Sequence, residues 1–420
     1  MINIDENNNI IVQEVYKAIL VGVSTGEDIS YSMEELKSLA EASGAEVIGE
    51  MVQNVERINS GTFIGSGKLD ELAEMCKNME ADLVIFNDEL SGMQIRNIED
   101  VAGVRIIDRT MLILDIFASR AMSREGKLQV ELAQLQYRMP RLLGFGKSLS
   151  RLGGGIGTRG PGEKKLETDR RHIQRRMDEI KKEMEEVKAN RSIQRAKREK
   201  SDIPVAALVG YTNAGKSSIM NALVKEKQVF EKDMLFATLD TASRCIELED
   251  GKKFILIDTV GFVSKLPHAL VNAFKATLEE VVNADLLIHV VDASFENHDF
   301  QIEVTEKVLG ELKADSKESL LVFNKIDKTP GFNSLGRESL NISAKTGEGM
   351  DALKDAIVKK LFSDFEVCHL LIPYDRGDIV SYINDKTKPL ETKYDEKGTV
   401  ITAELDSADR NRLCQYFIKQ

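Results

Sequence analysis

Residues 205–218 read VAALVGYTNAGKSS, an apolar run followed by a glycine-rich loop that leads into the helical pattern of residues 219–224. The loop matches GxxxxGK[ST] in the strand, loop and helix context that this motif requires. Backbone N–H groups in such a loop surround phosphate oxygens, and the start of the helix favours negative charge. The stretch therefore predicts a P-loop nucleotide-binding domain.

The side chains of this loop have separate predicted tasks. Lys216 is expected to reach the β- and γ-phosphates, and Ser217 to ligate Mg²⁺, a hard cation that prefers oxygen. The whole predicted phosphate-binding set is Gly210, Tyr211, Thr212, Asn213, Ala214, Gly215, Lys216, Ser217 and Ser218.

A second motif, FILIDTVG at residues 254–261, is an apolar strand that ends in an aspartate. Asp258 is suited to holding Mg²⁺ through water, and Gly261 leaves its amide free to approach the γ-phosphate. We include the intervening Thr259 and Val260 in the predicted nucleotide site.

A third motif, LLVFNKID at residues 320–327, predicts guanine as the base. The Asp327 carboxylate can accept from both N1–H and the N2 amine of guanine, and adenine has no equivalent pair of donors. A ligand that leaves the polar groups of such a site unpaired can be discriminated against by roughly 10⁴- to 10⁵-fold relative to the correct ligand. Asn324 is expected to contact the base and the ribose-side loops, and the Lys325 stem to cover the ring.

The remaining predicted site residues lie in two loops. Residues 343–345 follow a short strand, and the Ala344 amide is expected to meet guanine O6, with Ser343 and Lys345 beside it. In the polar stretch 235–240, Thr238 is preferred over Thr241 and Thr259 as a switch residue that completes the magnesium shell. The predicted catalytic residues are thus Lys216, Thr238 and Gly261, and the predicted metal ligands are Ser217 and Thr238.

Position 262 holds phenylalanine, where many small GTPases carry a glutamine that orients the attacking water. A phenyl ring cannot hydrogen-bond that water, so slow intrinsic hydrolysis, accelerated by a partner, is expected.

The composition points to a folded, multidomain chain. Its 420 residues exceed the size of one typical domain, with 42% hydrophobic and 30% charged residues. No apolar stretch reaches 18 residues and the start is not a secretory signal, so a cytoplasmic protein without integral membrane association is expected. The four cysteines form no CxxC pair, which gives no signal for zinc or disulfides.

The first third alternates apolar runs at residues 18–23, 45–52, 83–86 and 104–107 with helical patterns. Such alternation predicts a parallel α/β domain. Residues 61–69 superficially resemble a phosphate loop, but Leu69 stands where a hydroxyl is needed, and we interpret the segment as a turn.

Two helical patterns follow, at residues 116–143 and 166–187, and predict an antiparallel helical hairpin. Residues 120–200 contain 22 Lys and Arg against 11 Asp and Glu, although the whole chain has a net charge of -12. The loop from Gly144 to Gly162 combines glycines with cations, which suits an RNA backbone. The alternative interpretation of the basic charge is a solvated helical hairpin, and the alternative interpretation of the glycine-rich loop is a flexible hinge.

The chain resembles the HflX family of ribosome-associated GTPases along most of its length. The resemblance is carried by the guanine-nucleotide motifs together with residues 108–110, 114–117, 128–137, 140–142, 153–163 and 166–171. It departs from the family at Lys164 and Lys165, where Thr-Gln is usual, and at Thr241, where proline is usual.

The resemblance implies an N-terminal α/β domain at residues 1–117, a basic hairpin at 118–200, a P-loop GTPase domain at 201–363 and a small C-terminal α/β module at 364–420. It also implies that the glycine-rich loop binds RNA of the large ribosomal subunit near the peptidyl transferase region, and that the GTP-bound protein splits or rescues stalled ribosomes under stress. We expect a monomer that does not bind DNA. A GTP-gated switch for ribosome assembly or protein interaction is the alternative function.

Overall fold

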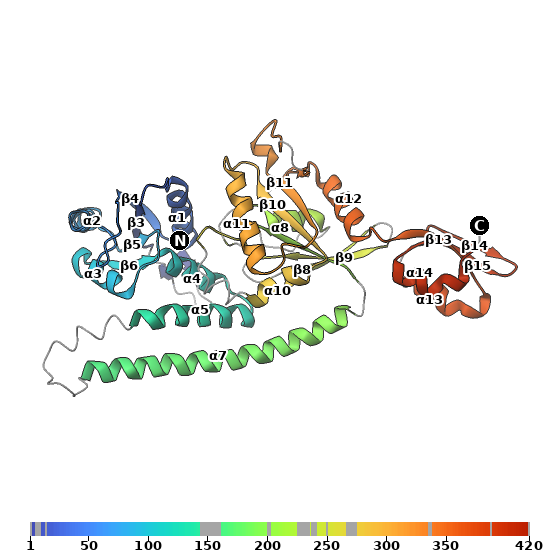
Figure 1. Ribbon diagram of the computed structural model, residues 1–420, viewed down its shortest axis with the longest axis horizontal. Coiled ribbons are helices and arrows are strands. Elements are labelled where there is room, and N and C mark those ends of the chain that lie inside the picture. Colours follow the sequence, from blue (N-terminus) through green and yellow to red (C-terminus); the bar gives the residue numbers. More distant parts are fainter. Residues whose placement is uncertain are drawn as a thin grey trace. The chain divides into compact units, whose positions relative to one another are not determined.

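The structure is a computed structural model of the chain (Figure 1). It describes residues 2–4, 10–12, 15–142, 161–199, 203–224, 236, 242–248, 251–265, 275–334, 338–386 and 389–418. The chain forms two compact units: one comprises residues 1–193, 232–240 and 263–276, and the other comprises residues 194–231, 241–262 and 277–420.

The first unit contains a four-stranded parallel sheet with the order β4-β3-β5-β6, which confirms the predicted N-terminal fold. Its strands are β3 (Lys17–Ser24), β4 (Glu46–Asn54), β5 (Leu83–Phe86) and β6 (Arg105–Asp108). Seven of the eight residues of β3 are buried, as expected for a central strand that is covered on both faces. A separate two-stranded hairpin joins β1 (Ile2–Ile4) to β2 (Ile10–Val12).

Four helices accompany this sheet: α1 (Ser30–Ala42), α2 (Ser66–Met79), α3 (Gly92–Ala102) and α4 (Arg109–Arg120). Ser91 begins α3 with a capping box, since its hydroxyl accepts from the Gln94 amide while the Gln94 side chain accepts from the Ser91 amide. The segment interpreted as a turn is one only in its first half, because α2 begins at Ser66.

The single helical pattern at residues 116–143 is two helices in the structure, α4 and α5 (Arg124–Leu142). The break falls at residues 121–123, where the Ser123 hydroxyl accepts from the Gly126 amide at 2.9 Å. A serine at this position competes with helix continuation by capping the next helix. Because α4 extends to Arg120, the predicted domain boundary at residue 117 falls inside this helix.

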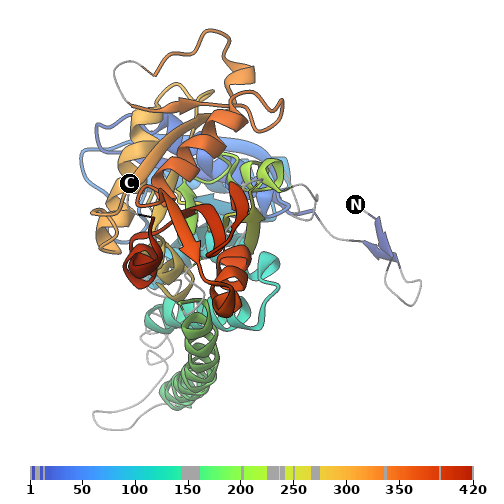
Figure 2. The same cartoon turned by 90° about the vertical axis from the view of Figure 1, so that its right-hand side faces the viewer.

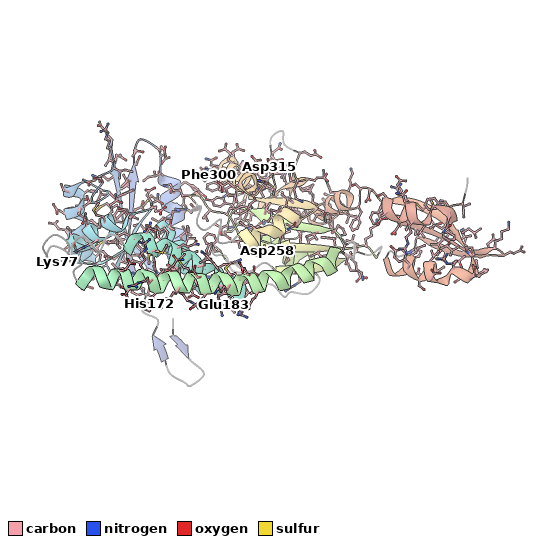
Figure 3. The ribbon with its side chains drawn as sticks, turned by 60° about the horizontal axis from the view of Figure 1, so that its bottom comes forward. Lys77, His172, Glu183, Asp258, Phe300 and Asp315 are labelled. Atoms are coloured by element: carbon pink, nitrogen blue, oxygen red, sulfur yellow. The ribbon has the colours of Figure 1, made fainter. Side chains whose placement is uncertain are left out.

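Helix α7 (Pro161–Glu199) pairs with α5 in antiparallel fashion, as Figure 1 shows. Leu128 and Leu132 of α5 pack against Met177 and Ile180 of α7. Figure 3 labels Glu183 on α7, and its carboxylate pairs with Arg124, at the start of α5, at 3.1 Å. The first helical residue of α7 is Pro161, a favoured first position, so the predicted loop to Gly162 ends slightly earlier. Residues 143–160 lie outside the described residues.

The second unit contains a six-stranded sheet with the order β12-β11-β10-β7-β9-β8, parallel except for β8. Its strands are β7 (Val205–Gly210), β8 (Ala242–Glu247), β9 (Lys253–Asp258), β10 (Leu286–Asp292), β11 (Ser319–Asn324) and β12 (Leu340–Asn341). Its helices are α8 (Lys216–Leu223), α10 (Lys275–Asn283), α11 (His298–Glu311) and α12 (Met350–Leu361). Apolar residues of α8 and α12 pack on one core with β7, β9 and β10. Strand β7 lies between β10 and β9 inside the sheet, and the P-loop follows its carboxyl end.

The same unit ends in a three-stranded antiparallel sheet, β13-β15-β14. Its elements are β13 (Glu366–Ile372), α13 (Gly377–Lys386), β14 (Glu391–Asp395), β15 (Gly398–Leu405) and α14 (Ser407–Leu413). Figures 1 and 2 show both helices on one side of this sheet. None of the described helices combines the length and the apolar composition needed to cross a lipid bilayer.

Candidate functional site

The P-loop lies where β7 meets α8, and two of its glycines are required by close approach. A Cβ at Gly210 would lie 2.1 Å from the carbonyl oxygen of Val290, and a Cβ at Gly215 would lie 2.2 Å from the amide nitrogen of Asn324. Both glycines also have positive φ, at 145° and 93°. A side chain at Gly210 would push the loop away from the backbone of β10, and one at Gly215 would collide with the Asn324 side chain.

Lys216 begins α8 and is almost fully buried. Its ammonium donates to the carbonyl oxygens of Gly210 at 3.1 Å and of Tyr211 at 2.9 Å, which holds the amine inside the loop. Burial lowers the pKa of Lys216 to about 8, an effect that Asp258 opposes and Lys325 reinforces. A desolvated cation of this kind gains from an anionic ligand, because the ligand restores the lost favourable charge interactions.

Ser217 and Asp258 come together beside this amine. The Ser217 hydroxyl donates to an Asp258 carboxylate oxygen at 2.6 Å, and Asp258, labelled in Figure 3, is fully buried at the end of β9. A hydroxyl and a carboxylate supply hard oxygen donors, so these two residues fit Mg²⁺ chemistry. The hydroxyl of Thr259 donates instead to the Leu208 carbonyl, at 2.6 Å. Thr238 lies outside the described residues.

The segment around Gly261 lies directly against the P-loop. A Cβ at Gly261 would lie 2.6 Å from the Thr212 Cα and 3.0 Å from the Lys216 amine. The backbone of Phe262 accepts from the Thr212 amide at 2.7 Å and donates to the Gly210 carbonyl at 3.1 Å. The Phe262 side chain is buried, with 2% of its surface exposed. This position therefore anchors the segment, and its ring does not project into solvent.

Asn324 connects the two halves of the predicted nucleotide site. Its side-chain amide donates to the Ala214 carbonyl of the P-loop at 2.9 Å, and its oxygen accepts from the Ala344 backbone amide at 3.0 Å. Sequence reasoning assigned the Ala344 amide to guanine and Asn324 partly to the base. In the structure these two groups bond to each other, so Asn324 tethers the loop at residues 343–345 to the P-loop.

Asp327 lies in a short 3₁₀ turn (Ile326–Lys328) and faces Ser343. The Ser343 hydroxyl donates to the Asp327 carboxylate at 2.7 Å. This hydrogen bond is the main reason that the pKa of Asp327 is held below its usual range. Asp327 therefore stays an ionised, acceptor-only group through neutral pH, as recognition of the guanine donors requires.

Sequence reasoning missed Asp292, the last residue of β10. Its carboxylate pairs with the Lys325 ammonium at 2.7 Å and also accepts from the Ser294 hydroxyl at 2.6 Å. Lys325 itself has a φ of 67°, and the ion pair fixes its side chain in this unusual backbone conformation. A strand ending in aspartate, as at Asp258, was the signal in the sequence that could have identified it.

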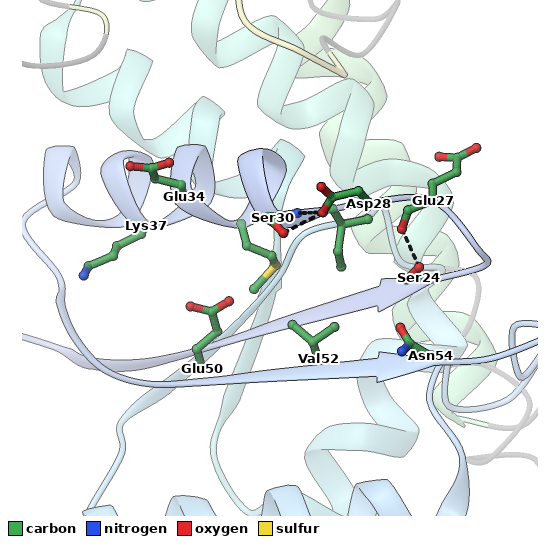
Figure 4. Close-up of a pocket in the computed structure, with 11 residues that line it drawn as sticks. Ser24, Glu27, Asp28, Ser30, Glu34, Lys37, Glu50, Val52 and Asn54 are labelled. Carbon is green, nitrogen blue, oxygen red and sulfur yellow. Dashed lines mark hydrogen bonds between the residues drawn. The ribbon is translucent and has the colours of Figure 1, made fainter. Parts of the chain in front are cut away.

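A separate cavity of about 480 Å³ lies beside α1 and β4 in the first unit (Figure 4). Its lining includes Glu27, Asp28, Glu34 and Glu50 but only one cation, Lys37. The Ser30 hydroxyl and amide both bond to Asp28, which lowers the pKa of that carboxyl. Such an acidic lining repels phosphate, so the cavity does not suit a nucleotide's phosphate groups.

Three family descriptions match consecutive parts of the chain. Residues 30–118 match "GTP-binding GTPase N-terminal", residues 120–198 match "GTP-binding GTPase Middle Region", and residues 205–325 match "50S ribosome-binding GTPase".

Similar proteins cover almost the full length. The chain is 50% identical over 402 residues to GTPase HflX of Caldanaerobacter subterraneus subsp. tengcongensis, covering 96% of this chain and 94% of that protein. It is 40% identical over 408 residues to GTPase HflX of Escherichia coli K12, covering 95% and 96% of the two chains. A GTP-binding protein from Sulfolobus solfataricus, solved in complex with GDP, is 26% identical, covers 83% of this chain and 99% of its own, and gives a TM-score of 0.44.

The matches to the two relatives extend through the N-terminal sheet, the hairpin, the P-loop domain and the C-terminal sheet. With a P-loop in its required structural context and Asp327, the predicted guanine-reading residue, in the same unit, the chain is a GTP-binding and GTP-hydrolysing protein that belongs to the HflX family.

Proposed function

We propose that this GTPase binds the large ribosomal subunit in its GTP form and splits or rescues stalled ribosomes under stress, acting as a monomer in the cytoplasm. The observation that carries the nucleotide part is the Asn324 side chain, which bonds to the P-loop and to the loop of Ala344 at once. Asn324 therefore connects the predicted phosphate site to the predicted guanine site, so binding at either site acts on the same side chain. The match of residues 205–325 to a 50S ribosome-binding GTPase family supports the choice of partner.

Hydrolysis in this site depends on position and charge. Lys216 and the P-loop amides stabilise the negative charge on the transferred phosphoryl group, and the Gly261 amide is expected to contact it. Mg²⁺, held by the Ser217 hydroxyl with Asp258 beside it, would neutralise charge on the phosphate oxygens. Thr238 is the proposed additional ligand in the switch segment.

The base is held by the second group of proposed site residues. Asp327 accepts from the guanine donors, the Lys325 stem covers the ring, and Ser343 orients the carboxylate. Asp292 fixes Lys325 and so acts as a positioning residue. Ala344 and Lys345 complete the loop that faces the base.

We expect Phe262→Gln not to increase intrinsic GTP turnover. The phenyl ring is buried, so a glutamine there would leave a polar amide without solvent and lower the free energy of unfolding by about 1–3 kcal/mol. Thermal unfolding and single-turnover hydrolysis check both expectations, with Phe262→Leu as the volume-matched control. A clear acceleration with unchanged stability would show that position 262 faces the attacking water.

Selectivity for GDP over ADP should stay constant from pH 8 to pH 5. The Ser343 hydroxyl keeps the pKa of Asp327 below its usual range, so the carboxylate loses its charge only in stronger acid. In Ser343→Ala the pKa returns toward its ordinary value, and selectivity should begin to fall at a higher pH than in the wild type. Titration with fluorescent nucleotides, extended from pH 8 down to about pH 3, measures for each protein the pH at which selectivity begins to fall. Identical pH profiles would contradict this role of Ser343.

The proposed contact with ribosomal RNA uses the loop from Gly144 to Gly162 and the helices that present it. Exposed cations occur along α7, among them Arg170, Arg171, Arg175, Lys181 and Lys182. Neutralising phosphates with such side chains releases counterions, so binding should weaken steeply with salt. This charge supports a polyanionic partner, and the family match supports the choice of ribosomal RNA.

Sedimentation with purified large subunits tests the proposal. Co-migration with a nonhydrolysable GTP analogue but not with GDP, followed by an assay in which whole ribosomes fall apart into subunits, is the expected result. Binding confined to immature particles would favour an assembly role. Absence of subunit binding under all nucleotide conditions would favour a protein-interaction switch and overturn the ribosome proposal.

A further inference from the structure

Helix α4 contacts a residue from each of the two chain segments that flank the Asp258 motif. Ser264 follows Gly261 by three residues, and Phe236 precedes the proposed switch residue Thr238 by two. Both residues belong to the first compact unit, together with α4, whereas Gly261 and the P-loop belong to the second. The two segments thus connect the nucleotide site covalently to the N-terminal sheet domain.

Ser264 is held by a buried ion pair. The guanidinium of Arg109, the first residue of α4, donates to the carboxylate of Glu35 on α1, and both side chains are at least 97% buried. The Ser264 hydroxyl accepts from Arg109 at 3.0 Å and donates to Glu35. Next to it, the Lys265 ammonium pairs with Asp88, which follows β5, at 2.5 Å.

This arrangement has a definite place in the fold. Chain connections leave β3 and β5 in opposite directions, so the carboxyl ends of these neighbouring strands form the switch point of the sheet. Asn87, which follows β5, accepts from Arg109 at 3.0 Å. The crevice where open α/β sheets bind ligands is therefore occupied in this chain by its own Ser264.

Phe236 makes the second contact with α4. Its ring is 2% exposed and meets Phe117 edge-on, with ring centroids 4.6 Å apart. Edge-to-face aromatic pairs are specific in geometry and contribute beyond the area that they bury. One end of α4 therefore holds Ser264, and the other end holds Phe236.

The residue before α4 reaches the hairpin. Asp108 is fully buried, caps α4 through the Met111 amide at 2.9 Å, and accepts from the Tyr137 hydroxyl and from Arg141 at 3.4 Å. Arg141 also stacks 3.4 Å over the Tyr137 ring and donates to the Leu90 carbonyl at 2.9 Å. Asp108 therefore binds the C-terminal part of α5, and the adjacent Arg109 binds the segment after Gly261. Both contacts are made at the start of α4.

We propose that the start of α4 is a relay, in which Arg109 and Glu35 hold Ser264, and Asp108 transmits the position of α4 to Tyr137 and Arg141 at the end of α5. The inference rests on the proposed GTP switch, because it explains how the nucleotide reaches the hairpin. Movement of Gly261 toward the γ-phosphate pulls on Ser264, and the buried pair does not separate because each charge would be left unpaired. The pull consequently moves α4 as a unit.

Hydrogen exchange on the purified full chain tests the relay without any ribosome. Amides at residues 137–142 should exchange at rates that differ by roughly fivefold or more between the GDP form and the form with a nonhydrolysable GTP analogue. Ser264→Ala should abolish that difference while GDP affinity stays within about twofold, because the partners of the hydroxyl, Arg109 and Glu35, are not among the predicted nucleotide-binding residues. Ser119→Ala, on the exposed side of α4, is the matched control and should keep the difference.

Reciprocity provides a second readout. Tyr137→Phe removes only the hydroxyl that donates to Asp108, and it should change the ratio of GTP-analogue to GDP affinity by about threefold or more, because coupling between two sites acts in both directions. Tyr374→Phe, whose hydroxyl bonds to the Asp395 carbonyl in the C-terminal sheet, should leave the ratio unchanged. The double variant Ser264→Ala/Tyr137→Phe should shift the affinity ratio no further than the larger single change. Two residues of the same relay should not have additive effects, because either substitution alone interrupts the coupling.

Three results would overturn the relay: equal exchange in both nucleotide forms of the wild type, a difference that persists in Ser264→Ala, or independent effects in the double variant. These measurements do not involve ribosomes. A chain that passes them but does not bind large subunits would retain the relay and lose the proposed ribosomal function, so the two failures are distinguishable.

Discussion

Asp327→Asn should reverse the base preference of the site from guanine to xanthine nucleotides. The carboxylate can accept from two guanine donors, whereas an asparagine presents an N–H₂ group to the N2 amine and suits the oxygen of xanthine at that position. Because mismatched polar groups are left unpaired, we expect GTP affinity to fall by roughly 10³-fold or more and XTP affinity to rise toward the wild-type GTP value. Competition binding with GDP and XDP measures the change.

Ser343→Ala is the matched control for this reversal. It removes the donor that holds the Asp327 carboxylate at 2.7 Å but keeps the acceptor that recognises the base. We expect GDP affinity to fall by about tenfold at most, equivalent to one hydrogen bond of 0.5–1.5 kcal/mol, with the preference for guanine intact. Unchanged selectivity in Asp327→Asn would place base recognition elsewhere.

Lys216→Ala should eliminate measurable GTP binding. The amine is buried inside the P-loop, and removing it takes away the cation that would form charge-assisted hydrogen bonds to phosphate. We expect the affinity for both GTP and GDP to fall below the measurable range, since uncompensated phosphate charge must be desolvated on binding. Isothermal titration calorimetry is the measurement.

Lys307→Ala on the exposed surface of α11 removes the same charge away from the P-loop and should bind GTP normally. Circular dichroism and thermal unfolding of both variants separate a folding defect from a binding defect. Micromolar affinity in folded Lys216→Ala protein would contradict the phosphate role of this residue.

The sequence was most informative where a local pattern fixes the chemistry. The apolar run before Gly210 and the spacing to Lys216 predicted the strand, loop and helix, because only a glycine-rich turn there lets the backbone approach phosphate. The alternating apolar runs of the first third predicted the parallel N-terminal sheet for a similar reason, since buried parallel strands are apolar throughout.

The sequence was least informative where a side chain has a partner that is distant along the chain. Asn324 was predicted to contact the base and the ribose-side loops, but its hydrogen bonds to Ala214 and Ala344, which lie 110 and 20 positions away, were not predicted. The helix predicted across residue 121 failed because a single serine cap decides between one helix and two, and periodicity does not distinguish them. Thr238 remains a prediction from sequence alone.

The amino-acid sequence by itself determined the P-loop and the two long helices of the basic hairpin, because each depends on a local pattern of residues. It also predicted Asp327 as the guanine-reading residue from the pattern at residues 320–327. Only the tertiary structure decided that Ser264 lies between Glu35 and Arg109, across 229 and 155 positions. The physical reason is that burying a charged pair requires several sheet and helix ends to converge, and that convergence is a property of the folded chain.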